Sequence, residues 1–377
     1  MLVSPIAKIM KNANCLTIKV GSSLLVNPKT GIVNKRWVKA LADDVDLLKK
    51  QNTKVIIVTS GAVALGLERL GIEGRPSQLE QAQAAAAIGQ VQLLEAYKEP
   101  FNSNGFEISQ LLLTLDDLEN RPRYLNARNT LEVLLENGII PIINENDTVA
   151  TSELRFGDND RLAARVAQMA SSELLILLSD IDGLYSEDPA FNPDARFIDV
   201  IDSITPEIKV MAGSPKISGF GSGGMVTKIE AAGIALAGGC AMVVMNGFKD
   251  SPIKRLMAGE RATLFKTLSD PLTVRKSWIR GMLSIKGKIY VDDGAEGALK
   301  KDASLLPAGV IKIKGPFDRG DLVGIFNSKN TKVGQGLVAY TSEDSQKIMG
   351  HNTCKIIDVL GYAGRGAIIH RNDLVLV

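Results

Sequence analysis

Six short apolar runs recur through the first 245 residues, and longer amphipathic stretches separate them. Each run has five or six residues rich in Ile, Val or Leu, the pattern of strands that are buried on both faces of a parallel sheet. The runs are residues 15–20, 54–58, 108–113, 139–143, 174–178 and 241–245. Helical spacing is found over residues 34–52, 81–97, 124–137, 160–169 and 225–237. The alternation predicts an α/β fold, a three-layer α/β/α sandwich with a mostly parallel sheet.

The rhythm changes near residues 264–276, and short alternating apolar segments follow. Turn signals such as Asp293-Gly294 and Gly315-Pro316 separate these segments, which indicates a small β-barrel or sandwich of about 95 residues. The predicted strands are 284–291, 310–314, 322–327, 332–340, 355–360 and 367–370. Because 377 residues exceed one ordinary core, we expect a first domain over 1–270, a linker over 271–283 and a second domain over 284–377.

Composition argues against a membrane, secreted or zinc protein. No apolar run reaches the roughly 18 residues that a membrane span needs, and the first 14 residues lack the layout of a secretory signal. Cys15, Cys240 and Cys354 lie far apart without CxxC spacing, so we expect buried thiols in a reducing compartment. These features predict a cytoplasmic protein.

Two predicted strands end in residues that suit a ligand site. Ligands bind at the carboxyl ends of the strands in open α/β sheets. Lys19 lies near the end of the first strand, and the loop Gly21-Ser22-Ser23 follows with backbone N–H groups that suit phosphate oxygens. The second strand is followed by Thr59-Ser60-Gly61, small residues that let a ligand approach the backbone. A lysine that extends to solvent and a plain tight turn are the alternative interpretations.

Two clusters of amides and carboxylates lie near later strand and helix ends, at residues 144–148 (NENDT) and 157–160 (GDND). Together they could recognise an ammonium group, bind a metal through oxygens, or cap the helix that starts near Asp160. Asp160 could act as a cap and also orient a lysine.

A glycine-rich segment, residues 219–228 (GFGSGGMVTK), matches GxGxxG only superficially, because no strand immediately precedes it. It also fails the P-loop pattern, since Lys228 comes four residues after Gly224 and Ile229 follows. We interpret it as a loop that opens a helix with a lysine near its start, which combines N–H groups, helix dipole and cation in one anion site. A plain flexible loop is the alternative.

Histidine is nearly absent, and both residues, His351 and His370, lie in the second predicted domain. A carboxylate acceptor is already ionised at neutral pH, so its phosphorylation needs no general base. Such a reaction needs in-line positioning and cations for the charge on the moving phosphoryl group. The two lysine-bearing loops, around Lys19 and Lys228, meet that need.

Six segments occur in the order found in the glutamate 5-kinases of the amino-acid kinase superfamily, which the chain resembles from about Leu16 to about Arg371. The segments are IKVGSS, VTSGAVALG, RYLNARNT, PIINENDTVAT, FGDNDRLAA and GFGSGGMVTK. Towards the C-terminus GKIYVDDGA, SLLPAGV, GPFDRGDLV and LGYAG resemble a PUA domain, a module best known in RNA-modifying enzymes.

The resemblance implies an ATP-dependent kinase that uses Mg²⁺ with ATP and converts glutamate to glutamyl 5-phosphate. This reaction would be the first step of proline biosynthesis. The resemblance also implies feedback inhibition by proline and a homo-oligomer (dimer or tetramer). It implies Lys19, Lys228 and Asp160 as catalytic residues and Ser60, Asp147 and Asn159 as glutamate-binding residues, with no protein metal ligand. Its implied ATP-binding residues are Lys19, Ser179, Asp180, Ser222, Gly223, Gly224, Met225, Val226, Thr227 and Lys228.

The chain departs little from the family pattern. Ser179 and Ser222 stand where the family often has Thr, and both keep a hydroxyl group. Residues 123–130 indicate only a polar helix start, which fits either a solvated, capped helix face or a role in the glutamate site or its regulation. The N-terminal extension receives no role. From Arg280 onward 14 Lys/Arg face 10 Asp/Glu, a surplus that permits RNA contact without implying it, so we favour a structural or regulatory PUA domain.

Three other functions compete with this interpretation. A related kinase could act on aspartate, N-acetylglutamate, carbamate or a nucleoside monophosphate, but the NENDTVAT and GDND pair with a PUA domain argues against it. An RNA-binding protein defined by its PUA domain would leave the two lysine loops unexplained. A bifunctional synthase fails, because the chain is too short for an added dehydrogenase domain.

Overall fold

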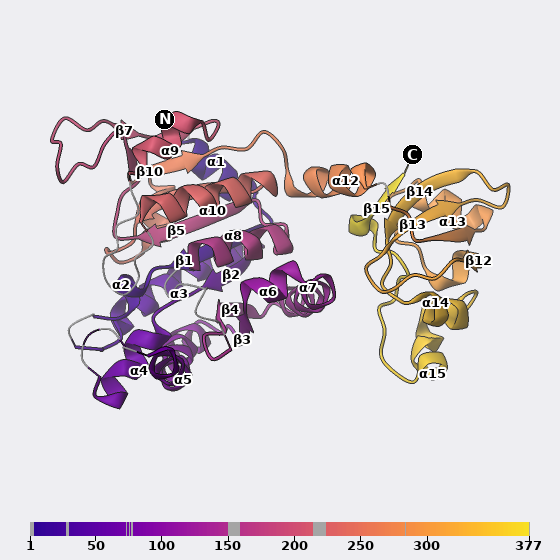
Figure 1. Ribbon diagram of the computed structural model, residues 1–377, viewed down its shortest axis with the longest axis horizontal. Coiled ribbons are helices and arrows are strands. Elements are labelled where there is room, and N and C mark those ends of the chain that lie inside the picture. The colour runs from indigo at the N-terminus through magenta and orange to yellow at the C-terminus, as the bar shows by residue number, and fades with distance from the viewer. Residues whose placement is uncertain are drawn as a thin grey trace. The chain divides into compact units, whose positions relative to one another are not determined.

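The computed structural model of the chain divides into two compact units, residues 1–271 and 272–377 (Figure 1). It describes residues 4–27, 30–72, 74, 76, 78–149, 159–213, 224–282 and 284–376. In these residues no helix is both long and apolar enough to cross a membrane.

An eight-stranded sheet forms the centre of the first unit, in the order β3-β4-β2-β1-β5-β9-β10-β8. All six strands predicted from the apolar runs are confirmed, and they pair in parallel. They are β1 (Cys15–Val20), β2 (Lys54–Val58), β3 (Ile108–Leu113), β4 (Ile140–Glu145), β5 (Leu174–Ser179) and β9 (Ala241–Asn246). The short strands missed by the pattern are β10 (Ala262–Phe265), antiparallel to β9, β8 (Val200–Ile201), and the hairpin of β6 (Leu184–Tyr185) and β7 (Phe197–Ile198).

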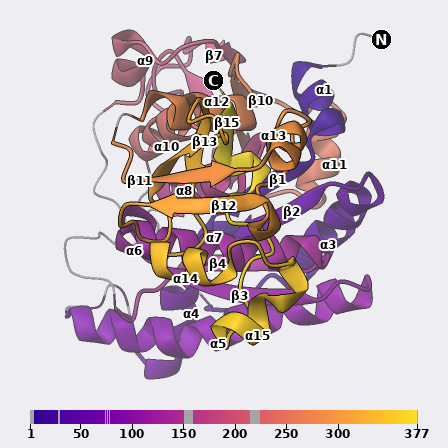
Figure 2. The ribbon, with the colours of Figure 1, turned by 90° about the vertical axis from the view of Figure 1, so that its right-hand side faces the viewer.

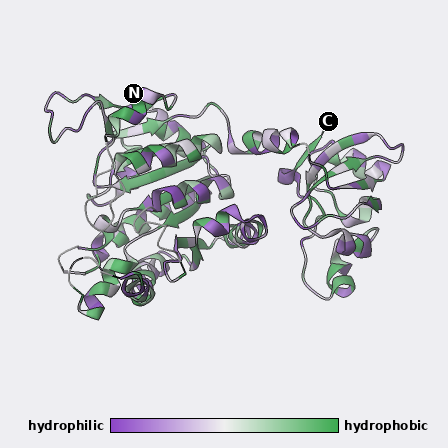
Figure 3. Cartoon of the chain, viewed as in Figure 1, coloured by the Kyte–Doolittle hydropathy of each residue, from purple (hydrophilic) through white to green (hydrophobic). Residues whose placement is uncertain are grey.

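Helices cover both faces of this sheet, which confirms the three-layer prediction (Figures 1 and 2). Successive strand residues point to opposite faces, so Leu16 and Ile18 pack in one cluster and Cys15 in the other. Figure 3 shows the hydrophobic strands between helices with hydrophilic residues. Helices that contribute residues to the first cluster are α1 (Pro5–Asn12), α3 (Lys35–Lys50), α4 (Ala62–Leu70), α5 (Leu79–Ser103) and α11 (Pro252–Met257). Helices that contribute residues to the second cluster are α6 (Leu115–Glu119), α7 (Arg121–Glu136), α8 (Asn159–Ala170) and α10 (Met225–Ala237).

The N-terminal extension has a structural place in the first unit. It forms α1, which Ser4 caps by accepting a hydrogen bond from the Ala7 N–H over 3.1 Å. Met10 of this helix is fully buried in the first core cluster. The extension therefore contributes to the core, which the sequence pattern had not revealed.

Helices α4 and α5 pack backbone against backbone through two glycines. A Cβ atom added to Gly66 would lie 1.7 Å from the Ala85 carbonyl oxygen, and one on Gly89 would lie 1.8 Å from the Ala62 carbonyl oxygen. Only glycine permits this approach. The close packing fixes the start of α4, and with it the loop that follows β2.

The second unit contains a five-stranded mixed sheet in the order β12-β11-β13-β14-β15, as expected of a small β domain. Four predicted strands are confirmed, as β11 (Gly287–Val291), β12 (Val310–Lys314), β13 (Leu322–Phe326) and β14 (Lys332–Leu337). The unit also contains helices α13 (Asp293–Leu299) and α14 (Ser342–Ile348).

Two strand predictions in the second unit are wrong. Residues 355–360 end a 3₁₀ turn and form the helix α15 (Ile356–Leu360), because Ile356, Val359 and Leu360 follow helical spacing and pack into the core. Residues 367–370 make only the isolated bridge between Ile369 and Leu305, and the last strand is instead β15 (Leu374–Leu376).

The predicted linker contains the helix α12 (Pro271–Gly281), which packs on the second unit from Leu272 onward. Ile279 is fully buried against Leu322, Leu337 and Val375. The Gln335 Nε2 donates to the Ile279 carbonyl over 2.7 Å, and Arg275 forms a buried ion pair with Asp373. These contacts hold α12 firmly against the sheet.

Candidate active site

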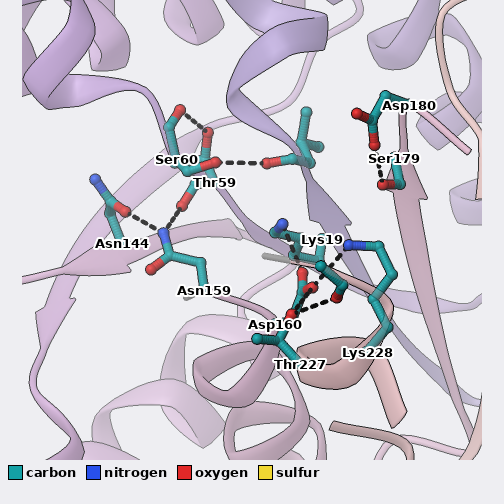
Figure 4. A network of polar contacts seen from close by, with 12 residues as sticks. Lys19, Thr59, Ser60, Asn144, Asn159, Asp160, Ser179, Asp180, Thr227 and Lys228 are labelled. Atoms are coloured by element: carbon teal, nitrogen blue, oxygen red, sulfur yellow. Dashed lines mark hydrogen bonds and ion pairs between the residues drawn. The ribbon is translucent and has the colours of Figure 1, made fainter. Parts of the chain in front are cut away.

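A pocket opens at the carboxyl ends of β1, β2, β4 and β5, the edge where the sequence places its polar loops (Figure 4). Its empty volume, open mouth included, is about 950 Å³. Seven of the predicted site residues line it: Lys19, Ser60, Asp147, Asn159, Ser179, Asp180 and Lys228. The chain reverses its direction of winding beside β1, and such a switch point is where ligands bind in open α/β sheets.

One buried carboxylate, that of Asp160, holds two lysines in this pocket. Lys19 Nζ lies 2.6 Å from Asp160 Oδ1, and Lys228 Nζ lies 3.1 Å from Asp160 Oδ2. Figure 4 shows the two lysines converging on this side chain. Lys19 comes from β1, Asp160 from the first turn of α8 and Lys228 from the first turn of α10, so three distant segments meet here.

In the triad of Lys19, Asp160 and Lys228, the two lysine charges keep the buried Asp160 carboxyl group ionised. Burial alone would favour the neutral acid, but the ammonium groups of Lys19 and Lys228 hold the pKa of Asp160 well below its usual range. Asp160 is therefore ionised at neutral pH, and the triad carries a net positive charge. The carboxylate fixes the spacing of two cations that face the pocket.

The second element predicted to bind an anion is the start of α10. Gly224 is its N-cap, and Met225 and Val226 begin the helix, so their backbone N–H groups lie at the positive end of the dipole. Thr227 Oγ1 donates to the Gly224 carbonyl over 2.9 Å and lies 3.3 Å from Asp160 Oδ2. The predicted ATP-binding residues Ser222 and Gly223 lie outside the described residues, as do Gly157 and Asp158.

Asp160 is not the cap of α8, contrary to one of the two roles considered for it. The helix begins at Asn159, which puts Asp160 inside the first turn. Its carboxylate is committed to the two lysines.

A chain of buried amides fixes the orientation of Asn159. Its Nδ2 donates to the Thr59 carbonyl and, over 2.7 Å, to Asn144 Oδ1. Asn144 Nδ2 in turn donates to Gln90 Oε1 over 2.7 Å. Because a backbone carbonyl can only accept, the amide nitrogen of Asn159 must face Thr59. Its Oδ1 accepts no hydrogen bond from the described residues, so Asn159 presents an acceptor to any ligand.

Asp147 lines the same pocket without a cation beside it in the described part of the chain. Burial raises the pKa of its carboxyl to about 6. A ligand ammonium group would relieve this penalty. Asp147 is thus suited to bind a cationic group of a substrate.

Two further predicted residues lie at the end of β5. Ser179 Oγ donates to Asp180 Oδ1 over 2.9 Å, and Asn246 Nδ2, at the end of β9, donates to the Asp180 carbonyl over 3.1 Å. Ser60 Oγ donates to the Val20 carbonyl over 3.0 Å, which joins the loops after β1 and β2.

Sequence reasoning missed two residues that support the site from α5. Tyr97 bonds Thr59 through their hydroxyls at 3.0 Å, and Gln90 ends the amide chain. Neither stands in a motif, since both lie within an ordinary amphipathic helix, so no local signal marks them. The cysteine prediction is right for Cys15 and Cys240, which are buried, and wrong for Cys354, which is exposed.

Comparison with known proteins matches residues 14–246 to the amino acid kinase family and residues 287–360 to the PUA domain. A curated glutamate 5-kinase of Paramagnetospirillum magneticum is 50% identical over 374 residues, covering 99% of this chain and 100% of the relative. That of Rhodospirillum rubrum is 50% identical over 95% of this chain and 96% of its own length. Among solved structures, carbamate kinase from Giardia lamblia is 16% identical, with a TM-score of 0.48 over 68% of this chain and 99% of its own.

Proposed function

Because the chain belongs to the amino acid kinase family, and within it groups with the glutamate 5-kinases, we propose that it transfers the γ-phosphoryl group of ATP to the side-chain carboxylate of L-glutamate. A carboxylate oxygen attacks the γ-phosphorus, the bond to the β,γ-bridging oxygen breaks, and ADP leaves with the electron pair. The products are L-glutamyl 5-phosphate and ADP. The observation that carries this proposal is the Lys19–Asp160–Lys228 triad in one pocket.

The two lysines stabilise the charge that moves during transfer. An ammonium has three donors, so a lysine paired with Asp160 can still donate to a phosphate oxygen. Asp160 orients both cations before the substrates arrive, which avoids reorganisation during the reaction. No general base is required, because the attacking carboxylate is ionised at neutral pH.

Glutamate is held by residues from two loops and from the start of α8. Asp147 pairs with the α-ammonium group, and Asn159 Oδ1 accepts a further hydrogen bond from it. The hydroxyl of Ser60, which donates to the Val20 carbonyl in the structure, would turn to donate to a carboxylate oxygen of the substrate. The raised pKa of Asp147 and the fixed amide of Asn159 support these assignments.

ATP takes the other side of the pocket, between Ser179-Asp180 and the start of α10. Its phosphates would meet Lys19, Lys228 and the N–H groups of residues 222–228. Mg²⁺ would arrive bound to the phosphates and offset part of their charge. Asp160 is already paired with two lysines, so we assign the ion no protein ligand.

A substrate panel tests the proposal: ADP release with glutamate, aspartate, N-acetylglutamate, carbamate and UMP, each with and without proline. We expect turnover with glutamate at least 10²-fold above N-acetylglutamate, carbamate and UMP, because two oriented acceptors select a free α-ammonium group. Aspartate has that group but is one methylene shorter, so we expect its turnover to be at least tenfold below that of glutamate. Preference for N-acetylglutamate or UMP, or no glutamate-dependent turnover, would refute it.

We further propose that the enzyme catalyses the first step of proline biosynthesis in the cytoplasm, is inhibited by proline, and assembles as a homodimer or homotetramer. Residues 1–270 would carry catalysis, 271–283 the connection and 284–377 the PUA domain, to which we assign a structural or regulatory role. Size-exclusion chromatography with light scattering tests the assembly, and the proline arm of the substrate panel tests the inhibition.

A second candidate function, binding of single-stranded nucleic acid, rests on one face of the C-terminal sheet. The rings of Tyr290 and Phe326, paired on β11 and β13, lie 5.6 Å apart. Lys288 lies 4.9 Å from the Phe326 ring, and Lys312 and Lys314 lie 6.0 and 5.8 Å from the Tyr290 ring. Stacking rings beside cations suit unpaired bases and their phosphates. Anisotropy of a labelled ten-nucleotide uridine RNA tests it: Tyr290→Ala should weaken binding about tenfold, and an unchanged affinity would exclude this face.

A further inference from the structure

Four cationic side chains surround a pocket in the second unit, separate from the face of Tyr290 and Phe326. Lys276, Arg280, Lys300 and Arg371 line it, together with the single carboxylate of Asp302. Apolar residues such as Leu299 and Val375 also line it, and its empty volume with the mouth is about 560 Å³. The lining residues therefore carry four positive charges and one negative charge.

The elements that carry these cations are held rigidly together. Lys276 and Arg280 lie four residues apart on α12, and Arg371 precedes β15. The ion pair between Arg275 and Asp373 joins the two elements, and its side chains are only 11% and 7% exposed. The bond from Gln335 to the Ile279 carbonyl anchors the last turn of α12. The side chains of Lys276 and of the exposed Arg280 and Arg371 thus project from elements whose backbones are fixed to one another.

Two of the four cations have no counter-charge in the described part of the chain. Lys276 pairs with Asp302 at 3.0 Å and Lys300 with Glu296 at 2.8 Å. Arg280 and Arg371 form no ion pair with any described residue, although both line the pocket. Like charges four residues apart on a helix, as at Lys276 and Arg280, destabilise it slightly. An anion in the pocket would remove this repulsion.

We propose that this pocket binds the phosphate group of a small phosphorylated molecule. Guanidinium groups present paired N–H donors that match two oxygens of one phosphate. A phosphate dianion neutralises two unpaired arginines, whereas a carboxylate would neutralise one. The inference goes beyond the kinase reaction, because the pocket lies in the second unit and shares no residue with the catalytic pocket.

The structure supplies a fluorescent reporter within the second unit for the test. Trp278 lies on α12, two residues from both Lys276 and Arg280 and outside the pocket lining, and is 56% exposed, whereas the other tryptophan, Trp37, is fully buried in the first unit. Inorganic pyrophosphate is titrated into the full-length protein while Trp278 fluorescence and heat are recorded. We expect saturable binding in the sub-millimolar range. Arg280→Ala and Arg371→Ala should each weaken it at least tenfold, because each removes one guanidinium.

Arg319→Ala is the matched control, since Arg319 is exposed on the same unit but does not line the pocket. It should leave the affinity within twofold. The absence of saturable binding would overturn the proposal, as would affinities in the Arg280 and Arg371 variants equal to that of the native protein. A ten-nucleotide uridine RNA forms the second arm: Arg280-dependent binding of this RNA without pyrophosphate binding would also overturn a small phosphorylated ligand.

Discussion

Replacement of Asp160 by Asn tests whether one carboxylate holds the two active-site lysines. The side chains of Lys19, Asp160 and Lys228 are 9%, 2% and 4% exposed, so the substitution leaves two buried cations without their counter-ion. Removing one partner of a buried ion pair costs about 3–5 kcal/mol. In a domain of this size that loss lowers Tm by about 10 °C. Differential scanning calorimetry measures it in the full chain, where the transition of the first unit is followed.

Two controls separate this effect from a general loss of stability. Asp116→Asn removes a carboxylate that is 73% exposed and paired with Arg123, so we expect a change within about 0.5 kcal/mol. The second control is pH. Because the folded pKa of Asp160 is lowered, its stabilisation is present above the unfolded pKa of about 3.9 and is lost as pH falls through the lower folded value. The difference in Tm between native protein and Asp160→Asn should therefore narrow below about pH 4.

ATP provides the sharpest contrast for the same variant. Its phosphates neutralise the lysines in place of the missing carboxylate, so the rise in Tm caused by ATP should be larger in Asp160→Asn than in the native protein. The kcat should fall at least tenfold, since the cations lose their orientation. A change in Tm below about 2 °C without ATP, or equal rises with ATP, would refute our account of the triad.

Three further predictions concern other parts of the catalytic unit. Lys228→Ala should lower kcat at least 10²-fold, about 2.7 kcal/mol of transition-state stabilisation, and near-normal kcat would remove Lys228 from the mechanism. Because Asp147 has a pKa of about 6 when no substrate is bound, kcat/KM for glutamate should fall as pH drops below 6. Asp147→Asn should raise the glutamate KM and abolish that pH dependence, whereas a raised ATP KM alone would contradict the assignment. Gly89→Ala should destabilise the first unit by about 1–3 kcal/mol, because its Cβ would strike the Ala62 carbonyl, while Gly233→Ala should not, because its Cβ would make only an ordinary 3.9 Å contact with Ile204 Cδ1.

The Asp147 prediction depends on a property that the sequence could suggest but not establish. An Asn/Asp-rich segment after a strand is consistent with a cap, a metal site or an ammonium site. The folded chain shows that the Asp147 carboxyl group is partly buried with no described cation beside it. This environment favours an ammonium site over a cap or a metal site.

The sequence by itself determined six of the eight strands in the sheet of the first unit, and the edge that carries the polar loops. Strand period and run length are local properties, so Cys15–Val20 and the other five apolar runs could be assigned directly. The rule that ligands bind at strand ends then located Lys19, Ser60 and Asp147 without coordinates. The same approach failed at residues 355–360, because the apolar residues Ile356, Val359 and Leu360 also fit helical spacing, and only their packing into the core decides between helix and strand.

Tertiary structure decided which side chains meet. Lys228 and Asp160 are 68 residues apart in sequence, and the Asn159 amide contacts a carbonyl 100 residues away. No periodicity encodes such pairs, because each depends on how separately formed helices and strands pack. The same reason applies to Gln90 and to the four cations that meet beside α12, since their distance in space follows from packing alone.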